Sequence, residues 1–442
     1  MIFNTNNNSI HRKRNKALGI TELIAIALGG MVGGGIFSIL GISVSMIGVF
    51  TPLAIMLGGL IAFLAAYSYI KLGVYYKDEG ASYSFYKYTF PNSPFAASLI
   101  GWWVIFGYIS TIALYSYTFA SYAISGFAFA NDEWIRKLVA GAVIAIFTII
   151  NVWSVKGMGK IEDIMVYTKL VVLVVISFVL INNRNTNIPE LLQNNADTTI
   201  LSIFIVASIT FVAYEGFQLV LNGVNEMENP EKNIPKAIYS AMILAIAIYV
   251  IISLGAILAI PFEDIIVDKE YALASGANKI LGHWGNNLVI IGALLATSSA
   301  ISGTVFGASR QMAVIAKDGY FPRFLAKRTN HIPAAAILTM SSFAFCLVLA
   351  SNLEIILQFG SFTFILISLL MAHANYKKRI HTDSSTILII IALSVLSASS
   401  VLIIYFVVNT QIIQIFFIVG LYVLLTFCAW LFSRTKQNQI NH

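Results

Sequence analysis

The sequence has 442 residues, of which 58% are hydrophobic and 11% are charged, and its mean hydropathy is +0.82. This composition excludes a soluble enzyme and a nucleic-acid-binding protein, because so apolar a chain has to be buried largely in lipid. The net charge of +7 could indicate an anionic partner, but the Lys and Arg residues lie almost entirely between apolar segments. In that position they report orientation in a membrane.

Apolar segments of about 20 residues, the length that crosses a bilayer as a helix, recur along the whole chain. When they are separated at the polar residues between them, they number twelve. They predict an all-α membrane protein with twelve transmembrane helices over residues 18–46, 51–75, 95–127, 135–155, 163–181, 199–224, 236–260, 287–316, 333–351, 354–373, 385–408 and 411–433.

The distribution of basic residues predicts the orientation of these spans. An even number of spans places both termini on one side, and twenty of the 27 Lys and Arg residues lie on that side, against five on the other. The remaining two, Lys169 and Arg310, lie inside spans. Because cytoplasmic loops are enriched in Lys and Arg, we predict cytoplasmic termini in a multi-pass protein of the plasma membrane.

Two function classes lack the motifs that they require. No G-x-x-x-x-G-K-[ST] pattern occurs, which argues against primary transport by this chain alone. The six His residues lie in loops, in tails or at the ends of spans, which leaves no cluster for catalysis or metal binding. We therefore expect no enzyme activity, no cofactor and no metal. The expected partners are a small-molecule substrate and the lipid bilayer, with neither nucleic acid nor an obligate protein partner.

The first span contains five glycines among residues 29–35, a density that disfavours a continuous helix. If the helix unwinds there, the backbone N–H groups of Gly33, Gly34 and Gly35 are freed at the positive end of the half-helix that follows. Such a pocket suits a carboxylate. Close packing of helices through small residues explains the glycines equally well.

The sixth span contains a carboxylate, Glu215, beside Tyr214 and Gly216 at the middle of the segment. An uncompensated charge at the bilayer centre costs at least ~2.5 kcal/mol, so Glu215 should face a cavity or be protonated. A protonated packing residue is the alternative. Interruptions in corresponding spans of two halves are typical of the binding site of a secondary transporter.

The long connections at 76–94 and 261–286 lie on opposite faces, five spans apart, as an inverted repeat requires. The predicted domains are an N-terminal cytoplasmic tail (1–17), a single transporter domain (18–433) and a C-terminal cytoplasmic tail (434–442). The transporter domain comprises a first inverted repeat at 18–181, a second at 199–373 and additional helices at 385–433.

These features resemble the amino acid-polyamine-organocation superfamily of permeases over nearly the whole chain. The motifs that carry the resemblance are Gly33, Gly35, Ile36 and Phe37; Phe211, Ala213, Tyr214, Gly216 and Phe217; Glu226, Glu228-Asn229-Pro230, Lys232-Asn233-Ile234-Pro235 and Ala237-Ile238; Glu79-Gly80-Ala81-Ser82-Tyr83; and Ser309-Arg310, Asp318-Gly319 and Phe321-Pro322. The resemblance implies a LeuT-type fold of five plus five inverted helices with two C-terminal helices added.

The resemblance also implies roles for residues of the two interrupted spans. The amides of Gly33, Gly34 and Gly35 would bind the substrate carboxylate, and the carbonyls of Phe211, Ala213 and Glu215 would receive its ammonium group. At the position of Gly34 the family often has a hydroxyl residue, so one side-chain hydrogen bond is not expected here. Tyr214 and Gly216 complete the predicted substrate-binding set. The aromatic rings of Tyr214 and Phe217 could form a gate or pocket wall, although bundle packing explains them equally well.

Lys169 lies about 13 Å along the fifth span from its polar start, at 1.5 Å per residue. Burial at that depth favours the neutral form of a lysine, so Lys169 could exchange a proton near neutral pH. Snorkelling of its ammonium group to the cytoplasm is the alternative. In a proton-coupled branch of the superfamily a matching lysine takes the place of a sodium ion between the first and eighth spans. The resemblance thus implies H+ as the coupling ion.

The predicted function is secondary active amino acid transport by alternating access, with proton-coupled uptake. Amino acid or amine exchange is an alternative, and so is sodium symport through the eighth-span hydroxyls of Ser298, Ser299, Ser302 and Thr304. An ion channel or an amino acid sensor is the alternative from another class, but broken helices favour a closed binding site. The sequence does not predict which amino acids are carried.

Overall fold

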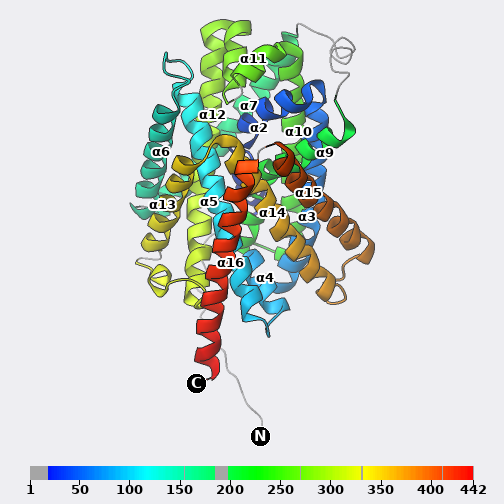
Figure 1. Cartoon of the computed structure of the whole chain (residues 1–442), viewed down its shortest axis with the longest axis vertical. Coiled ribbons are helices and arrows are strands. Elements are labelled where there is room, and N and C mark those ends of the chain that lie inside the picture. Colours follow the sequence, from blue (N-terminus) through cyan, green and yellow to red (C-terminus); the bar gives the residue numbers. More distant parts are fainter. Residues whose placement is uncertain are drawn as a thin grey trace.

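The computed structural model describes residues 18–153, 155–184, 198–268, 270–329, 332–410 and 412–441 (Figure 1). The predicted N-terminal tail, residues 1–17, lies outside these ranges. The described chain is helical throughout and contains no strand longer than an isolated bridge. Lipid offers no hydrogen-bond partner to a backbone, so apolar runs of this length satisfy their N–H and C=O groups as helices.

Within the described ranges, the helices follow one another along the chain in a fixed order. They are α1 (Ile20–Met31), α2 (Gly35–Ile47), η1 (Gly48–Phe50), α3 (Thr51–Tyr76), α4 (Ala81–Thr89), α5 (Pro94–Ile124), α6 (Glu133–Trp153), α7 (Val155–Asn182), α9 (Ile200–Ile209), η2 (Thr210–Tyr214), η3 (Phe217–Glu226), α10 (Pro230–Ala259), α11 (Phe262–Val267), α12 (Ala272–Lys317), η4 (Arg323–Ala326), α13 (Ala334–Ala350), α14 (Leu353–Lys378), α15 (Thr386–Thr410) and α16 (Ile412–Asn441).

The all-helical prediction is confirmed, and each of the predicted spans coincides with a helix or a chain of short helices. Within the described ranges, ten stretches are long and apolar enough to cross a membrane. Two further apolar helices, Ile20–Met31 and Ala334–Ala350, are shorter. The count of twelve crossings stays a prediction. One predicted span is divided into α1 and α2, and another corresponds to α13, whose 17 residues are fewer than a helix usually needs to cross a bilayer.

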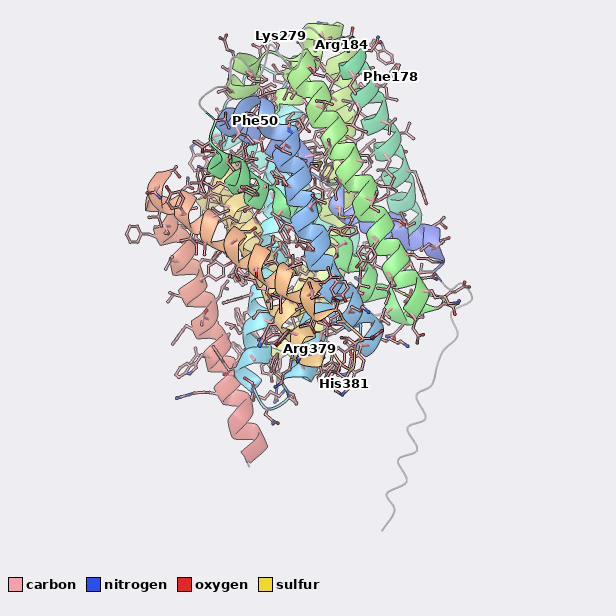
Figure 2. The ribbon with its side chains drawn as sticks, turned by 90° about the vertical axis from the view of Figure 1, so that its right-hand side faces the viewer. Phe50, Phe178, Arg184, Lys279, Arg379 and His381 are labelled. Carbon is pink, nitrogen blue, oxygen red and sulfur yellow. The ribbon has the colours of Figure 1, made fainter. Side chains whose placement is uncertain are left out.

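The two ends of the bundle carry the charged residues that the orientation argument used. Figure 2 shows Arg184 and Lys279 at one end and Arg379 with His381 at the other. The end of α16 lies at the same end as Arg379 (Figures 1 and 2). Arg184 and Lys279 therefore occupy the end opposite to Arg379 and the C-terminus, as the predicted spans require.

Polar connections between the predicted spans contain helices that the apolar windows did not reveal. α4 lies within the connection at 76–94, and α11 together with the first turns of α12 lies within that at 261–286. In α12 the backbone leaves helical geometry at Gly282, with φ +64° and ψ −158°. A window chosen for hydropathy misses such segments because their helices carry polar faces.

The broken helices lie at the centre of the bundle. α1 packs against η3 and α10, while α2 packs against η2, α9 and α11. α5 packs against α12, α14, α16 and α6, and crosses the middle of the view in Figure 1. Residues of α5, α10 and α12 contact the first interruption, and α3 and α14 pack against η2 at the second.

Candidate functional site

The first predicted span is interrupted, as expected, and the interruption falls at residues 32–34. α1 ends at Met31, and α2 begins at Gly35 with Gly34 as its N-cap. The N–H groups of Gly35, Ile36 and Phe37 open a helix and have no acceptor within it. The expectation that Gly33 is freed was wrong: its N–H donates to the Met31 carbonyl at 2.8 Å, because the chain makes a tight turn before the helix resumes. The amide cradle accordingly begins at Gly34.

The glycines of this interruption allow close contact with three other helices. A Cβ at Gly33 would lie 2.6 Å from Ala300 Cβ, and one at Gly34 would lie 3.0 Å from the Tyr115 ring and 3.1 Å from Thr297. At Gly35 it would lie 2.8 Å from Ala213. The sequence suggested either an interrupted helix or close helix packing as the reason for these glycines. The structure shows both at the same place.

The sixth predicted span is interrupted opposite the first. α9 gives way to the 3-10 segment η2, Glu215 is extended with ψ 140°, and Gly216 has φ +127° before η3 begins. A Cβ at Gly216 would lie 2.6 Å from the amide nitrogen of Met31. Only glycine allows both this φ and this approach. The two breaks therefore touch through backbone atoms.

Tyrosine hydroxyls bind the carbonyl groups at the interruptions. The single hydroxyl hydrogen of Tyr249 on α10 is shared between the carbonyls of Met31, at 2.7 Å, and Ala213, at 3.2 Å, so that one side chain bridges both broken helices. Tyr115 on α5 donates to the Gly30 carbonyl at 3.2 Å. The carbonyl of Ala213, expected to receive a substrate ammonium, thus already accepts one hydrogen bond and retains one lone pair.

Near the second interruption, Tyr214 and Phe217 contact α3, whereas Glu215 contacts Gln218. Tyr214 is fully buried and donates to the Ile55 carbonyl of α3 at 2.7 Å, so its hydroxyl serves packing. Phe217 packs edge-on against Tyr69 of α3, at 5.3 Å between ring centroids. Glu215 itself is 2% exposed, and its Oε2 accepts a hydrogen bond from Gln218 Nε2 at 2.6 Å.

Lys169 lies on α7 and is completely buried. Its Nζ donates to the Gly29 carbonyl in the last turn of α1, at 3.0 Å, and to Ser299 Oγ on α12, at 3.3 Å. Snorkelling to the cytoplasm is therefore excluded as its resting position in this structure. Ser299 is one of the eighth-span hydroxyls that the sequence offered for a sodium site, and it contacts Lys169 directly.

Four residues of the site were not identified from the sequence: Tyr115, Tyr249, Thr297 and Gln218. Tyr115 and Tyr249 are two of 20 tyrosines, and nothing in their neighbours distinguishes them. Thr297 directly precedes the serines that were considered. Gln218 stands three residues after Glu215, a spacing that brings side chains together on a helix, and this signal could have been used.

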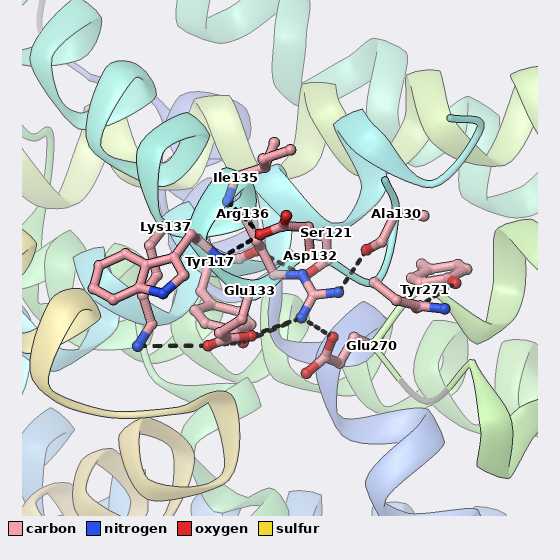
Figure 3. A network of polar contacts seen from close by, with 12 residues as sticks. Tyr117, Ser121, Ala130, Asp132, Glu133, Ile135, Arg136, Lys137, Glu270 and Tyr271 are labelled. Atoms are coloured by element: carbon pink, nitrogen blue, oxygen red, sulfur yellow. Dashed lines mark hydrogen bonds and ion pairs between the residues drawn. The ribbon is translucent and has the colours of Figure 1, made fainter. Parts of the chain in front are cut away.

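An ionic network around the buried Arg136 lies away from the interruptions, at the start of α6 (Figure 3). Arg136 contacts Glu270 and Glu133, the latter at 3.0 Å, and donates to the Ala130 carbonyl at 2.7 Å. Tyr117 of α5 donates to the Glu133 carboxylate at 2.8 Å. Arg136 is 3% exposed and joins α5, α6 and the segment before α12.

A second network lies around Asp318, just after α12. Its Oδ2 accepts from Tyr83 of α4 at 2.7 Å and pairs with Lys87 at 2.5 Å, while Lys436 of α16 donates to its carbonyl at 2.6 Å. Burial, followed by the nearby Asp318 carboxylate, raises the pKa of Tyr83, which keeps the hydroxyl as a donor. α4, α12 and α16 are thereby joined at one point.

The start of α1 and the end of η3 are joined by a short parallel bridge. Leu18 donates its N–H to the Glu226 carbonyl at 2.7 Å, and its own carbonyl accepts from the Glu228 N–H at 3.1 Å. The chain segments on which the two breaks lie are therefore also connected at this end.

Comparison with known proteins places these features in a family. The family model described as amino acid permease matches residues 18–432. Inner membrane transport protein YbaT of Escherichia coli is 27% identical over 315 residues, covering 71% of this chain and 72% of that protein. Branched-chain amino acid permease BcaP of Bacillus subtilis is 24% identical over 379 residues, covering 80% and 79%. The cystine/glutamate transporter of Pongo abelii is 25% identical over 348 residues, covering 77% and 69%.

Proposed function

The chain belongs to the amino acid permease family, and from this premise we propose that it accumulates amino acids by alternating access, driven by protons moving in the same direction. Membership itself makes the chain a multi-pass membrane transporter for amino acids and not an enzyme. The proposal adds the mechanism and the coupling ion. It also includes twelve crossings, with α1 and α2 as one broken span, both termini in the cytoplasm, and a place in the plasma membrane.

The observation that carries the proposal is the contact between two helix interruptions. The start of α2 supplies N–H groups at a positive helix end, beginning at Gly34 and Gly35, and these suit an α-carboxylate. The carbonyl of Ala213 lies across the contact and suits an α-ammonium group. Opposite ends of a zwitterion would thus be bound by opposite backbone dipoles, as in other transporters with discontinuous helices.

Lys169 supports protons as the coupling ion. Its ammonium group is bound by a carbonyl of α1 and a hydroxyl of α12, oxygen ligands of the kind that would hold a small cation. Loss of its proton would remove a charge-assisted hydrogen bond from the last turn before the break in α1. Protonation of Lys169 would in this way be coupled to the geometry of the amide cradle.

The test is uptake of a labelled amino-acid mixture into proteoliposomes under an inward proton gradient, with neither sodium nor internal amino acid. Accumulation that an uncoupler abolishes is the expected result. Uptake only when amino acid is loaded inside would overturn symport in favour of exchange. Uptake only with external sodium would overturn proton coupling and direct attention to Ser299 and its neighbours.

A further inference from the structure

Glu215 is the one Asp or Glu side chain that is buried among the described residues, and its carboxylate is only half satisfied. Resting on the proposed function, we propose that Glu215, positioned by Gln218, is a subsite for a positively charged substrate side chain, an ammonium or guanidinium group. The permease would accordingly prefer cationic amino acids over neutral ones of the same shape.

Gln218 fixes the orientation of the carboxylate. Its Oε1 accepts the Gly216 N–H at 3.0 Å, and its Nε2 donates to Glu215 Oε2 at 2.6 Å. A backbone N–H can only donate, so the amide oxygen has to face Gly216 and the amide NH2 group has to face the carboxylate. The same side chain therefore holds the turn at the break and one oxygen of Glu215.

The second oxygen, Glu215 Oε1, is buried and has no hydrogen-bond partner in the described part of the chain. None of the ion pairs between described residues involves Glu215. Leaving a buried acceptor without a donor is destabilising, and more so when the acceptor carries charge. An incoming cationic donor would remove that penalty, whereas a neutral apolar side chain would not.

The surroundings of Glu215 suit an organic cation. Tyr69 of α3 and Tyr108 and Tyr115 of α5 lie within electrostatic range of the carboxylate, and all three are buried. Aromatic faces attract ammonium and guanidinium groups, most strongly where water is excluded. Tyr115 also contacts the cradle of α2 through Gly34, so the subsite adjoins the position proposed for the α-carboxylate.

Competition binding to the purified full-length protein in detergent tests the proposal, with arginine and its neutral isostere citrulline as probes. The expected result is a preference for arginine that falls by about 10- to 100-fold in Glu215→Gln, the range that a hydrogen bond to a charged group provides. Gln218→Met should reduce the preference by a smaller factor, since the carboxylate remains. Glu228→Gln is the matched control, because it removes an exposed carboxylate from the segment after η3.

Two results would overturn the subsite: equal binding of arginine and citrulline by the wild-type protein, or an unchanged ratio in a folded Glu215→Gln variant. The first does not depend on any variant folding. If no amino acid binds, the proposed function fails, and butylguanidinium, which lacks the carboxylate, becomes the probe. Binding of butylguanidinium to the wild-type protein but not to Glu215→Gln would support the subsite, and its failure to bind would refute it.

Discussion

Lys169 Nζ lies 3.0 Å from the carbonyl oxygen of Gly29, so the buried cation of α7 is bound to the last turn of α1 before the helix breaks. Gly29 lies two residues before Met31, the last residue of α1. A change in the charge of Lys169 therefore acts directly on the backbone that leads into the amide cradle.

Replacement of Lys169 by Met keeps most of the side-chain volume and removes the charge. We expect proton-driven accumulation in proteoliposomes to fall to a ratio of about 1, because substrate movement is no longer linked to a proton, while binding and exchange persist. Lys236→Met is the control, since Lys236 is exposed on α10. Proton-driven accumulation that survives in Lys169→Met would rule out this role.

Gly216→Ala should disrupt the contact between the two breaks. A side chain there meets a φ of +127° and the backbone of Gly30 and Met31. We expect a loss of about 2 kcal/mol or more in stability, together with loss of transport. Thermal unfolding in detergent measures the first. Gly223→Ala, whose Cβ would be 3.4 Å from Leu18, should change little, and equal effects of both substitutions would contradict the interpretation.

Tyr249→Phe removes the hydroxyl that bridges Met31 and Ala213. Two buried carbonyl groups lose a donor, so stability should fall by about 1 to 3 kcal/mol. Because both carbonyls lie at the breaks, the KM for substrate should rise as well. Tyr405→Phe, at an exposed position on α15, provides the comparison for unfolding temperature and uptake kinetics. A Tyr249→Phe protein with unchanged KM would place the hydroxyl outside the functional site.

Arg136→Met tests the network of Figure 3. The substitution removes a buried partner from the partly exposed Glu270 and Glu133 carboxylates, and the free energy of unfolding should fall by about 1.5 to 3 kcal/mol, as for hydrogen bonds to charged groups. Lys279→Met breaks the pair with Asp264, in which Lys279 is 56% exposed, and should cost about 0 to 1 kcal/mol. Unfolding temperatures of both variants in the same detergent decide the matter; similar values would mean that burial of Arg136 is energetically unimportant.

The sequence was sufficient to predict where the long apolar helices lie and where two of them break, because lipid leaves apolar chains few alternatives. It did not reveal α4 and α11, which lie in polar connections. Gly33 shows where this reasoning ended: glycine density predicts an interruption but not which N–H group the turn uses for itself. Tyr115 and Tyr249 show a second limit. Their function depends on meeting carbonyls that lie 85 and 218 residues away in the chain, and no local pattern encodes such a pairing. The burial of Arg136 is a third limit, because a basic residue near a predicted span end looks the same in the sequence whether its partners are water or carboxylates.

The bridge at Leu18 and the backbone contact at Gly216 join the two broken helices at separate points along their length. Contacts at two separate points oppose both sliding and opening of α1 relative to η3. If α1 moves during transport, these two contacts favour a movement in which α1 and η3 shift together against α5 and α12. Such a movement would take place around Lys169, which connects α7 to both α1 and α12.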